Sequence, residues 1–171
     1  MPDSPPRNRS ARLVVSNTTP LIVLAGVGLL YTLGSLYGEI SIPEAVLREY
    51  RAGIMPGDPD IGQLTWIHVQ AIPRNPRVTE HLGAGETETI SLALSSNDSL
   101  VILDDLPARR QAKALGLLTT GSLGVLLEAR RQGLIQRVRL ILDQMVTQGR
   151  YISPELRAQV LKDAEESDDG A

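Results

Sequence analysis

The chain of 171 residues contains no cysteine, only two histidines and few aromatic residues. The lack of cysteine excludes a disulfide scaffold, thiol catalysis and a Cys-ligated zinc site, and it suits the cytoplasm, where we expect this protein. With only His68 and His81, the chain cannot build a multi-histidine metal site, and a Ser-His-Asp hydrolase is disfavoured. One Trp, four Tyr and no Phe are also too few for a platform on which single-stranded bases stack.

Long apolar runs and a net positive charge are missing as well. The apolar stretch 21–30 is interrupted by two glycines and is too short to span a bilayer, so we expect no membrane association. The net charge of −3 gives no overall basic footprint for nucleic acid. Seven of the 17 basic residues nevertheless lie between positions 109 and 139: Arg109, Arg110, Lys113, Arg130, Arg131, Arg137 and Arg139. They form either a phosphate-binding surface or the solvated faces of helices.

Length and composition predict a single globular domain with segments of different character at its ends. Residues 1–10, rich in Pro, Arg and Ser, are expected to form a flexible arm and not a signal peptide. Residues 11–150 form the main domain. Residues 151–171 supply a C-terminal helix, packed on the domain or on a partner, and an acidic tail expected to fray from residue 163.

Short apolar runs alternate with helical patterns along the main domain. This alternation predicts an α/β fold of three layers, α/β/α, with a central, mostly parallel sheet. Strands are expected at 13–15, 39–42, 65–72, 100–103 and 117–120. Helices are expected at 21–25, 29–36, 43–50, 83–94, 108–115, 122–131, 134–147 and from 153 onward.

Polar and acidic residues follow several of these strands. Asp104 and Asp105 come directly after the run 100–103, and Asn17 follows the first strand. Because ligands of open α/β sheets bind outside the carboxyl ends of the strands, these side chains are expected to converge there with Glu86 and Glu49. Oxygen ligands of this kind suit Mg²⁺ or Mn²⁺. The alternative, that Asp105 or Asp104 caps the next helix and Glu86 faces the dipole of its own helix, stays open at this point.

The order and spacing of six segments resemble the PIN-domain family, and within it a subgroup of uncharacterised predicted nucleic-acid-binding proteins. The segments are VVSNTTPLIVLAGVGLL, ISIPEAVLREY, LGAGETETISLAL, VILDDLPARRQAKALGL, TTGSLGVLLEARRQGLI and YISPELRAQVL. The resemblance implies a small α/β/α nuclease that cuts RNA with acidic residues and a divalent metal. Many members of the family are the toxin half of a toxin–antitoxin pair.

The resemblance also implies roles for individual residues. The first acidic position of the family falls at Asn17, the second at Glu49 or, less well, Glu44, and the third at Glu86 or Glu88. The fourth falls at Asp104 or Asp105, while Thr18 and Thr19 stand where the family often places a hydroxyl near the metal. Asn17 departs from the Asp of nuclease members: its amide oxygen can ligate a hard cation but brings no charge.

The resulting prediction is a Mg²⁺- or Mn²⁺-dependent endoribonuclease of PIN type that acts as the toxin of a toxin–antitoxin pair, with a small antitoxin as partner. The catalytic set is Glu49, Glu86, Asp104 and Asp105; the metal set is Asn17, Glu86, Asp104 and Asp105; the RNA contacts are Thr18, Thr19, Arg109, Arg110 and Lys113. A homodimer is expected through the apolar faces of 21–36 and of the C-terminal helix.

Two other functions remain open. A PIN-like module that binds nucleic acid or protein with weak or no catalysis is favoured by Asn17 and by the acidic net charge. A receiver-like domain that binds Mg²⁺ for phosphoryl chemistry requires a lysine after a downstream strand, and the sequence has none at such a place.

Overall fold

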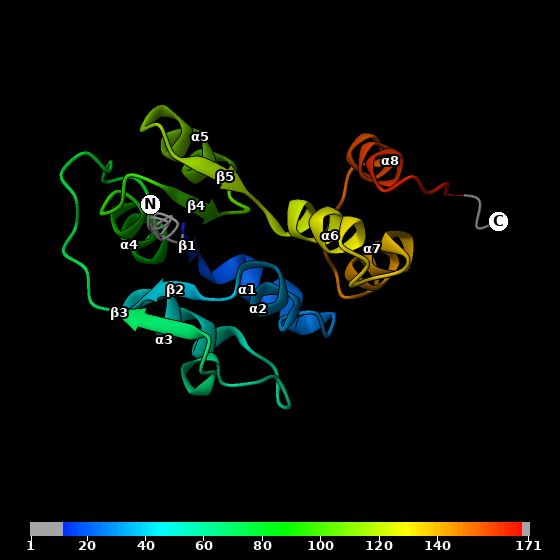
Figure 1. Ribbon diagram of the computed structural model, residues 1–171, viewed down its shortest axis with the longest axis horizontal. Coiled ribbons are helices and arrows are strands. Elements are labelled where there is room, and N and C mark those ends of the chain that lie inside the picture. Colours follow the sequence, from blue (N-terminus) through cyan, green and yellow to red (C-terminus); the bar gives the residue numbers. More distant parts are fainter. Residues whose placement is uncertain (1–11, 169–171) are drawn as a thin grey trace, which may run out of the picture.

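A sheet of five parallel strands forms the centre of the part of the chain that the computed structural model describes, residues 12–168 (Figure 1). The strands are β1 (Leu13–Ser16), β2 (Ile40–Pro43), β3 (Ile67–Gln70), β4 (Ser99–Ile102) and β5 (Leu118–Thr120). Their spatial order is β3-β2-β1-β4-β5. The chain thus builds outward from β1 on one side, then crosses to β4 on the other. The strand order therefore reverses between β1 and β4, which is where ligands of open α/β sheets bind.

Eight α-helices and one 3₁₀ helix connect and extend these strands within residues 12–168. They are α1 (Thr18–Gly26), α2 (Thr32–Tyr37), α3 (Glu44–Gly53), η1 (Ile61–Gln63), α4 (Ala84–Ala93), α5 (Leu106–Ala114), α6 (Ser122–Arg131), α7 (Val138–Thr147) and α8 (Pro154–Asp163). In this described part, no helix is long and apolar enough to cross a membrane.

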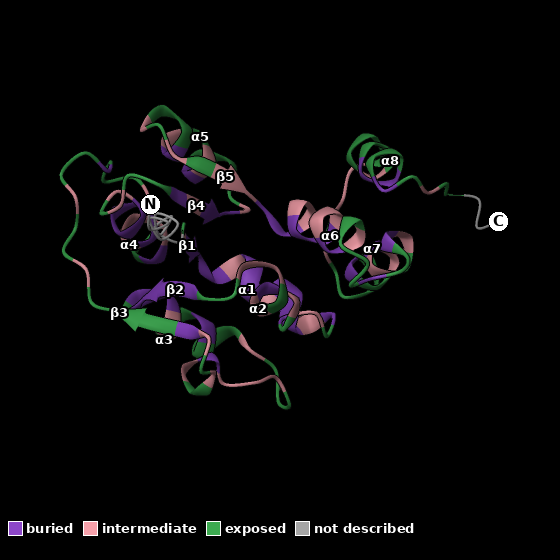
Figure 2. Cartoon of the chain, in the orientation of Figure 1, coloured by how far each residue is buried: buried purple, intermediate pink, exposed green. Residues whose placement is uncertain are grey.

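Successive residues of β1 point into two different cores. Val14 packs in a large core with α1, α2, α3 and the C-terminal helices, whereas Val15 packs with Val101 and Leu103 against α4 and α5. Figure 2 shows the buried residues gathered on β1, β2 and β4 and on the helices that cover them. The sheet is therefore covered on both faces, and the predicted three-layer α/β/α architecture is confirmed.

Several boundaries differ from the sequence-based expectation. The first helix begins at Thr18 and not at residue 21, because Pro20 lies in the first turn, where no intrahelical N–H is needed. The helix expected from residue 134 begins only at Val138. β3 is shorter than expected and lies at an edge of the sheet, with most of its side chains exposed.

The acidic end of the chain is ordered further than expected. Glu166 accepts hydrogen bonds from the backbone N–H groups of Val138 and Arg139 at 2.8 and 2.9 Å, so it caps the start of α7. Asp168 pairs with Arg157 of α8 at 2.7 Å. The expected fraying from residue 163 is thus wrong as far as residue 168, while the expected arm at residues 1–10 lies outside the described residues.

The two faces expected to form a homodimer are used inside the chain. Several large apolar residues of 21–36, among them Leu21, Leu24 and Leu33, are fully buried in the chain's own core, whereas Tyr31 is 57% exposed. Val160 and Leu161 of α8 are 3% and 2% exposed, because they pack in the same core as α6 and α7. The buried residues of these segments therefore belong to the chain's own core, while Leu156 of α8 is 46% exposed. The homodimer itself stays a prediction.

Candidate active site at the carboxyl ends of β1 and β4

Asn17 lies at the point where the strand order reverses, and its side chain is unusual for its position. It follows β1, and its backbone N–H donates to the carbonyl of Ile102 in β4 at 3.0 Å. Asn17 is also the N-cap of α1, a position where an Asn side chain ordinarily accepts a hydrogen bond from the first helical turn. Its side chain makes no such bond: Oδ1 is buried and has no partner among the described residues. An unsatisfied buried oxygen costs about 1–3 kcal/mol, and an ordered water or a ligand is the usual partner of such an atom.

Asp104 stands at the neighbouring strand end. Its Oδ1 accepts from the backbone N–H of Ser122 at 2.7 Å, and its Oδ2 accepts from the Ser122 hydroxyl at 2.6 Å. Ser122 opens α6, and its N-cap residue, Gly121, has no side chain that caps the helix. Asp104 therefore supplies the missing cap from another strand, and its carboxylate is fixed where the helix dipole favours a negative charge.

Glu49 links three helices beside Asn17. Its Oε2 accepts from the hydroxyl of Thr18 at 2.6 Å, and its Oε1 accepts from the backbone N–H of Gly85 in the first turn of α4 at 2.9 Å. Thr18, expected as an RNA contact, is buried and uses its hydroxyl for Glu49. Thr19 is half-buried.

The other acidic residues of the predicted set act as helix caps in this structure. Glu86 reaches back to its own helix start and accepts from the backbone N–H of Gly83 at 2.9 Å. Asp105 caps α5, since its Oδ1 accepts from the backbone N–H of Ala108 at 2.9 Å. Each cap uses one carboxylate oxygen.

Glu88, the alternative residue for the third acidic position, also accepts a hydrogen bond at a helix start. Glu88 accepts from the backbone N–H of Ala45, at the start of α3, at 3.2 Å. The structure thus joins Thr18 to Glu49 directly, places Asn17 and Asp104 at adjacent strand ends, and turns Glu86, Glu88 and Asp105 toward helix termini.

The donor atoms at this edge of the sheet are of the type that a divalent cation binds. The oxygens are carboxylates and an amide, the ligands that Mg²⁺ and Mn²⁺ prefer, and among the described residues the Oδ1 of Asn17 has no hydrogen-bond partner. Within residues 12–168, no three His, Cys, Asp or Glu side chains lie close enough together to hold a metal. The residues fit such an ion in the type of their donor atoms, and each carboxylate of the set also accepts hydrogen bonds within the chain.

The basic residues between 109 and 139 fall into two groups. Arg109 donates to the carbonyl of Leu103 at 3.4 Å and so lies against the end of β4, while Arg110 and Lys113 are exposed on the same helix. In the described part of the chain, these three cations of α5 form no ion pair.

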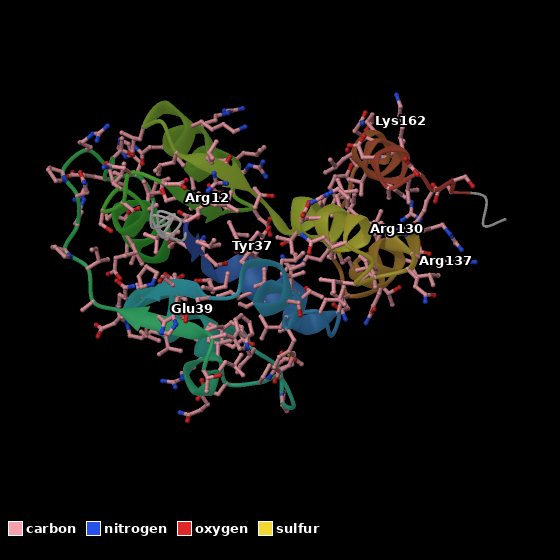
Figure 3. The ribbon with its side chains drawn as sticks, in the orientation of Figure 1. Arg12, Tyr37, Glu39, Arg130, Arg137 and Lys162 are labelled. Atoms are coloured by element: carbon pink, nitrogen blue, oxygen red, sulfur yellow. The ribbon has the colours of Figure 1, made fainter. Side chains whose placement is uncertain are left out.

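The arginines of the C-terminal helices are mostly neutralised. Arg130 pairs with Glu166, Arg131 with Glu128 and Arg139 with Asp143. Hydrogen bonds from the Arg131 and Gln132 side chains lower the pKa of Glu128 to about 2. Figure 3 shows Arg130 and Arg137 at the α6–α7 end of the molecule, away from α5. The phosphate-binding interpretation therefore suits α5, and the structural one suits α6 and α7.

Ser122 and Gly85 were not identified from the sequence as site residues. A signal for Ser122 exists, because Gly121 and Ser122 directly follow the last strand and so lie at the same edge of the sheet as Asp104. No comparable signal marks Gly85, whose contact with Glu49 depends on how α3 packs against α4.

Comparisons with known proteins bear on the family and the fold. A family model described as PIN domain matches residues 13–166. Among solved structures, a PilT N-terminus domain protein from the hyperthermophilic archaeon Sulfolobus solfataricus P2 is similar, with a TM-score of 0.52 and 22% sequence identity. The similarity covers 67% of this chain and 90% of that one, and at this identity it bears on the fold alone. No curated protein matches the chain significantly.

Proposed function

Since this chain belongs to the PIN-domain family, we propose that it is a metal-dependent endoribonuclease whose centre lies at the carboxyl ends of β1 and β4. The single observation that carries this proposal is the buried, unpartnered amide oxygen of Asn17. It stands where the strand order reverses, next to β4, the strand that leads into Asp104. Nothing in the capping of α1 accounts for that free oxygen.

Asn17 and Asp104 would hold the ion, with Glu49, Glu86 and Asp105 as the further carboxylates of the set. When bound, Mg²⁺ or Mn²⁺ supplies the activation of a water molecule and the neutralisation of charge that develops on the phosphate. Asn17 contributes an oxygen without charge, so the carboxylates must supply all the negative charge of the site. Glu49 reaches the site with its orientation already set by Thr18 and Gly85.

The unpaired cations of α5 support an RNA substrate. Arg109 lies at the end of the strand that carries Asp104, and Arg110 and Lys113 extend the positive charge along the same helix. Arg presents a planar fork that matches phosphate oxygens, and a cation without an acidic partner is free to bind them. RNA held along α5 would pass the proposed metal site.

The proposal is tested by RNA cleavage with Mn²⁺ or Mg²⁺, comparing the native chain with Asp104→Ala and Glu86→Ala. We expect Asp104→Ala to lower the rate by about 100-fold or more, because a metal site contributes several kcal/mol and each 1.36 kcal/mol is tenfold in rate. Glu39→Gln is the control, since Glu39 is an exposed acid that precedes β2, at the opposite edge of the sheet. Cleavage that survives both alanine substitutions would overturn the proposal.

The role of α5 is tested separately by the salt dependence of RNA binding. Replacing Arg110 and Lys113 by Gln should weaken binding and lower the slope of log affinity against log salt, because each phosphate contact releases counterions. Replacing Arg131 and Arg139 by Gln is the matched control, as both arginines are already paired, with Glu128 and Asp143. Equal effects of the two sets would remove α5 as the RNA contact.

We further propose that this nuclease is the toxin of a toxin–antitoxin pair. Its expression should then arrest growth, and Asp104→Ala should abolish the arrest. A small protein encoded immediately upstream should relieve the arrest when it is co-expressed. Growth arrest that persists with Asp104→Ala would separate toxicity from cleavage and contradict this assignment.

Asn17 supports a second function, a module that binds RNA without cutting it. A neutral residue at this position lowers the charge available to a cation. In that case RNA binding would depend on α5 as above, while cleavage would be absent with either metal.

A further inference from the structure

The Asp104 carboxylate is held at both of its oxygens by one residue. Ser122 donates its backbone N–H to Oδ1 at 2.7 Å and its hydroxyl to Oδ2 at 2.6 Å. Ser122 is 4% exposed, so its two donor groups are shielded from water, while Asp104 is half-buried. Two anchors on one carboxylate prevent its rotation about the bond that joins it to the rest of the side chain.

Close packing around Gly121 reinforces this arrangement. A Cβ at residue 121 would come within 2.8 Å of both Arg109 Nη1 and Asp104 Oδ1, and within 3.1 Å of the carbonyl oxygen of Leu103. The absence of a side chain at Gly121 therefore lets α6 begin directly against the carboxylate. The helix start, the strand end and the arginine of α5 meet at this point.

We propose that Ser122 is a positioning residue, which fixes the Asp104 carboxylate in the orientation required for a divalent cation. This inference rests on the proposed function. An ionised carboxylate has about four acceptor positions, and Ser122 occupies two, so each oxygen keeps one for a further partner. Ser122 itself touches neither RNA nor cation in this scheme; it acts through Asp104.

The hydroxyl is the part of Ser122 that substitution can remove. Ser122→Ala keeps the backbone bond to Oδ1 and loses the bond to Oδ2, so the carboxylate retains one anchor and regains its rotation. Loss of a group that orients a metal ligand lowers metal affinity by about 10- to 100-fold. Ser122→Thr retains a hydroxyl and should restore most of the affinity.

The test is calorimetric titration of the intact chain with Mn²⁺, without RNA, for the native protein, Ser122→Ala and Ser122→Thr. Ser99→Ala is the matched control: Ser99 is 6% exposed, and its hydroxyl donates to the carbonyl of Ala93 at 3.0 Å at the start of β4. We expect Ser122→Ala to bind Mn²⁺ about tenfold more weakly. Ser122→Thr and Ser99→Ala should bind it nearly as the native chain does, although both alanine variants lose some thermal stability.

Each outcome decides one of the two claims. If Ser122→Ala is folded and binds Mn²⁺ as tightly as the native chain, the positioning role is overturned while the proposed function stands. If the native chain itself binds neither Mn²⁺ nor Mg²⁺, the proposed function fails and the role of Ser122 fails with it. Should Ser122→Ala not fold, Ser122→Cys takes its place, because the thiol fills similar space but is a weak donor; native affinity in that variant equally overturns the role.

Discussion

Glu49 closes over Gly85 so tightly that no side chain fits at residue 85. Glu49 Oε1 accepts from the backbone N–H of Gly85 at 2.9 Å, and a Cβ on Gly85 would overlap Glu49 Oε2. The relationship is mirrored in the same pair of helices, because Glu88 of α4 accepts from the backbone N–H of Ala45 in α3 at 3.2 Å. Each helix therefore supplies an acid to the first turn of the other.

Gly85→Ala should displace the Glu49 carboxylate without unfolding the chain. Ala is favoured over Gly in a helix by about 1 kcal/mol, which offsets part of the lost hydrogen bonding to Glu49. We expect a small change in thermal stability, weaker Mn²⁺ binding and slower RNA cleavage. Gly83→Ala is the control, since a Cβ there meets Glu86 Oε2 at an ordinary 3.5 Å. Equal cleavage by the two variants would show that Glu49 has no part in the reaction.

Asn17→Asp should strengthen Mn²⁺ binding by about tenfold or more, because the number of charged ligands tunes the affinity of such sites. Without metal, the same change should lower the melting temperature, since it buries a charge that lacks a partner. Titration calorimetry and melting curves with and without Mn²⁺ measure both effects. Asn97→Asp adds the same charge at an exposed position before β4 and should change neither the Mn²⁺ affinity nor the melting temperature. Unchanged affinity in Asn17→Asp would remove residue 17 from the metal site.

Glu166→Gln should destabilise the protein at neutral pH by about 1 kcal/mol. Burial by itself raises the pKa of Glu166, but hydrogen bonds from the backbone N–H groups of Arg139 and Val138, together with Arg130, hold the pKa below its ordinary value of 4.5. A lowered folded-state pKa means that the charged form contributes stability above pH 4.5, which is lost as the pH falls through the folded value.

The stability difference between native Glu166 and Glu166→Gln should therefore shrink as the pH falls below 4.5. Urea unfolding at several pH values measures it. Glu165→Gln, at an exposed neighbouring position, should behave as the native chain does throughout. A difference that is independent of pH would mean that the charge of Glu166 contributes nothing.

Tyr50→Phe should make the free energy of unfolding less dependent on pH in the alkaline range. Burial, with Asp58 and Asp60 nearby, raises the pKa of Tyr50 from 10.0 to about 12. As the pH rises, the unfolded chain therefore loses this proton before the folded chain does. The neutral phenol contributes its full stabilisation of the fold below pH 10.0, and this stabilisation is lost as the pH rises to about 12.

Between these pH values, the free energy of unfolding should fall more steeply with pH for the native chain than for Tyr50→Phe. At neutral pH the variant loses about 1 kcal/mol with the hydrogen bond to the carbonyl of Pro59. Tyr151→Phe, at a tyrosine that is 87% exposed, is the control. Parallel alkaline profiles for all three proteins would contradict the assignment to Tyr50.

The sheet could be predicted from the sequence because its signals are local. Runs such as Leu100–Leu103 are apolar and rich in β-branched residues, and the alternation with helices implies parallel strands and two covered faces. The positions of Asn17 and Asp104 follow from the same rule, since both come directly after strands that turned out to be neighbours.

The partners of the acidic residues could not be predicted in this way. Asp104 and Ser122 meet because β4 pairs with β5, and Glu49 meets Gly85 because α3 packs against α4. Asp105 illustrates a choice that the sequence left open: a carboxylate after a strand suits either a metal or a helix cap, and here it caps α5. The tertiary structure decides between these two roles, and the residue type and its place after a strand do not.

The contact of Glu166 with α7 has a consequence for amide hydrogen exchange. N–H groups in the first turn of a helix have no intrahelical acceptor and normally exchange with solvent rapidly. Those of Val138 and Arg139 donate to Glu166, which follows α8, 28 and 27 residues further along the chain. Protection of these two amides therefore reports whether the end of the chain is docked, and a version truncated before residue 166 should lose that protection.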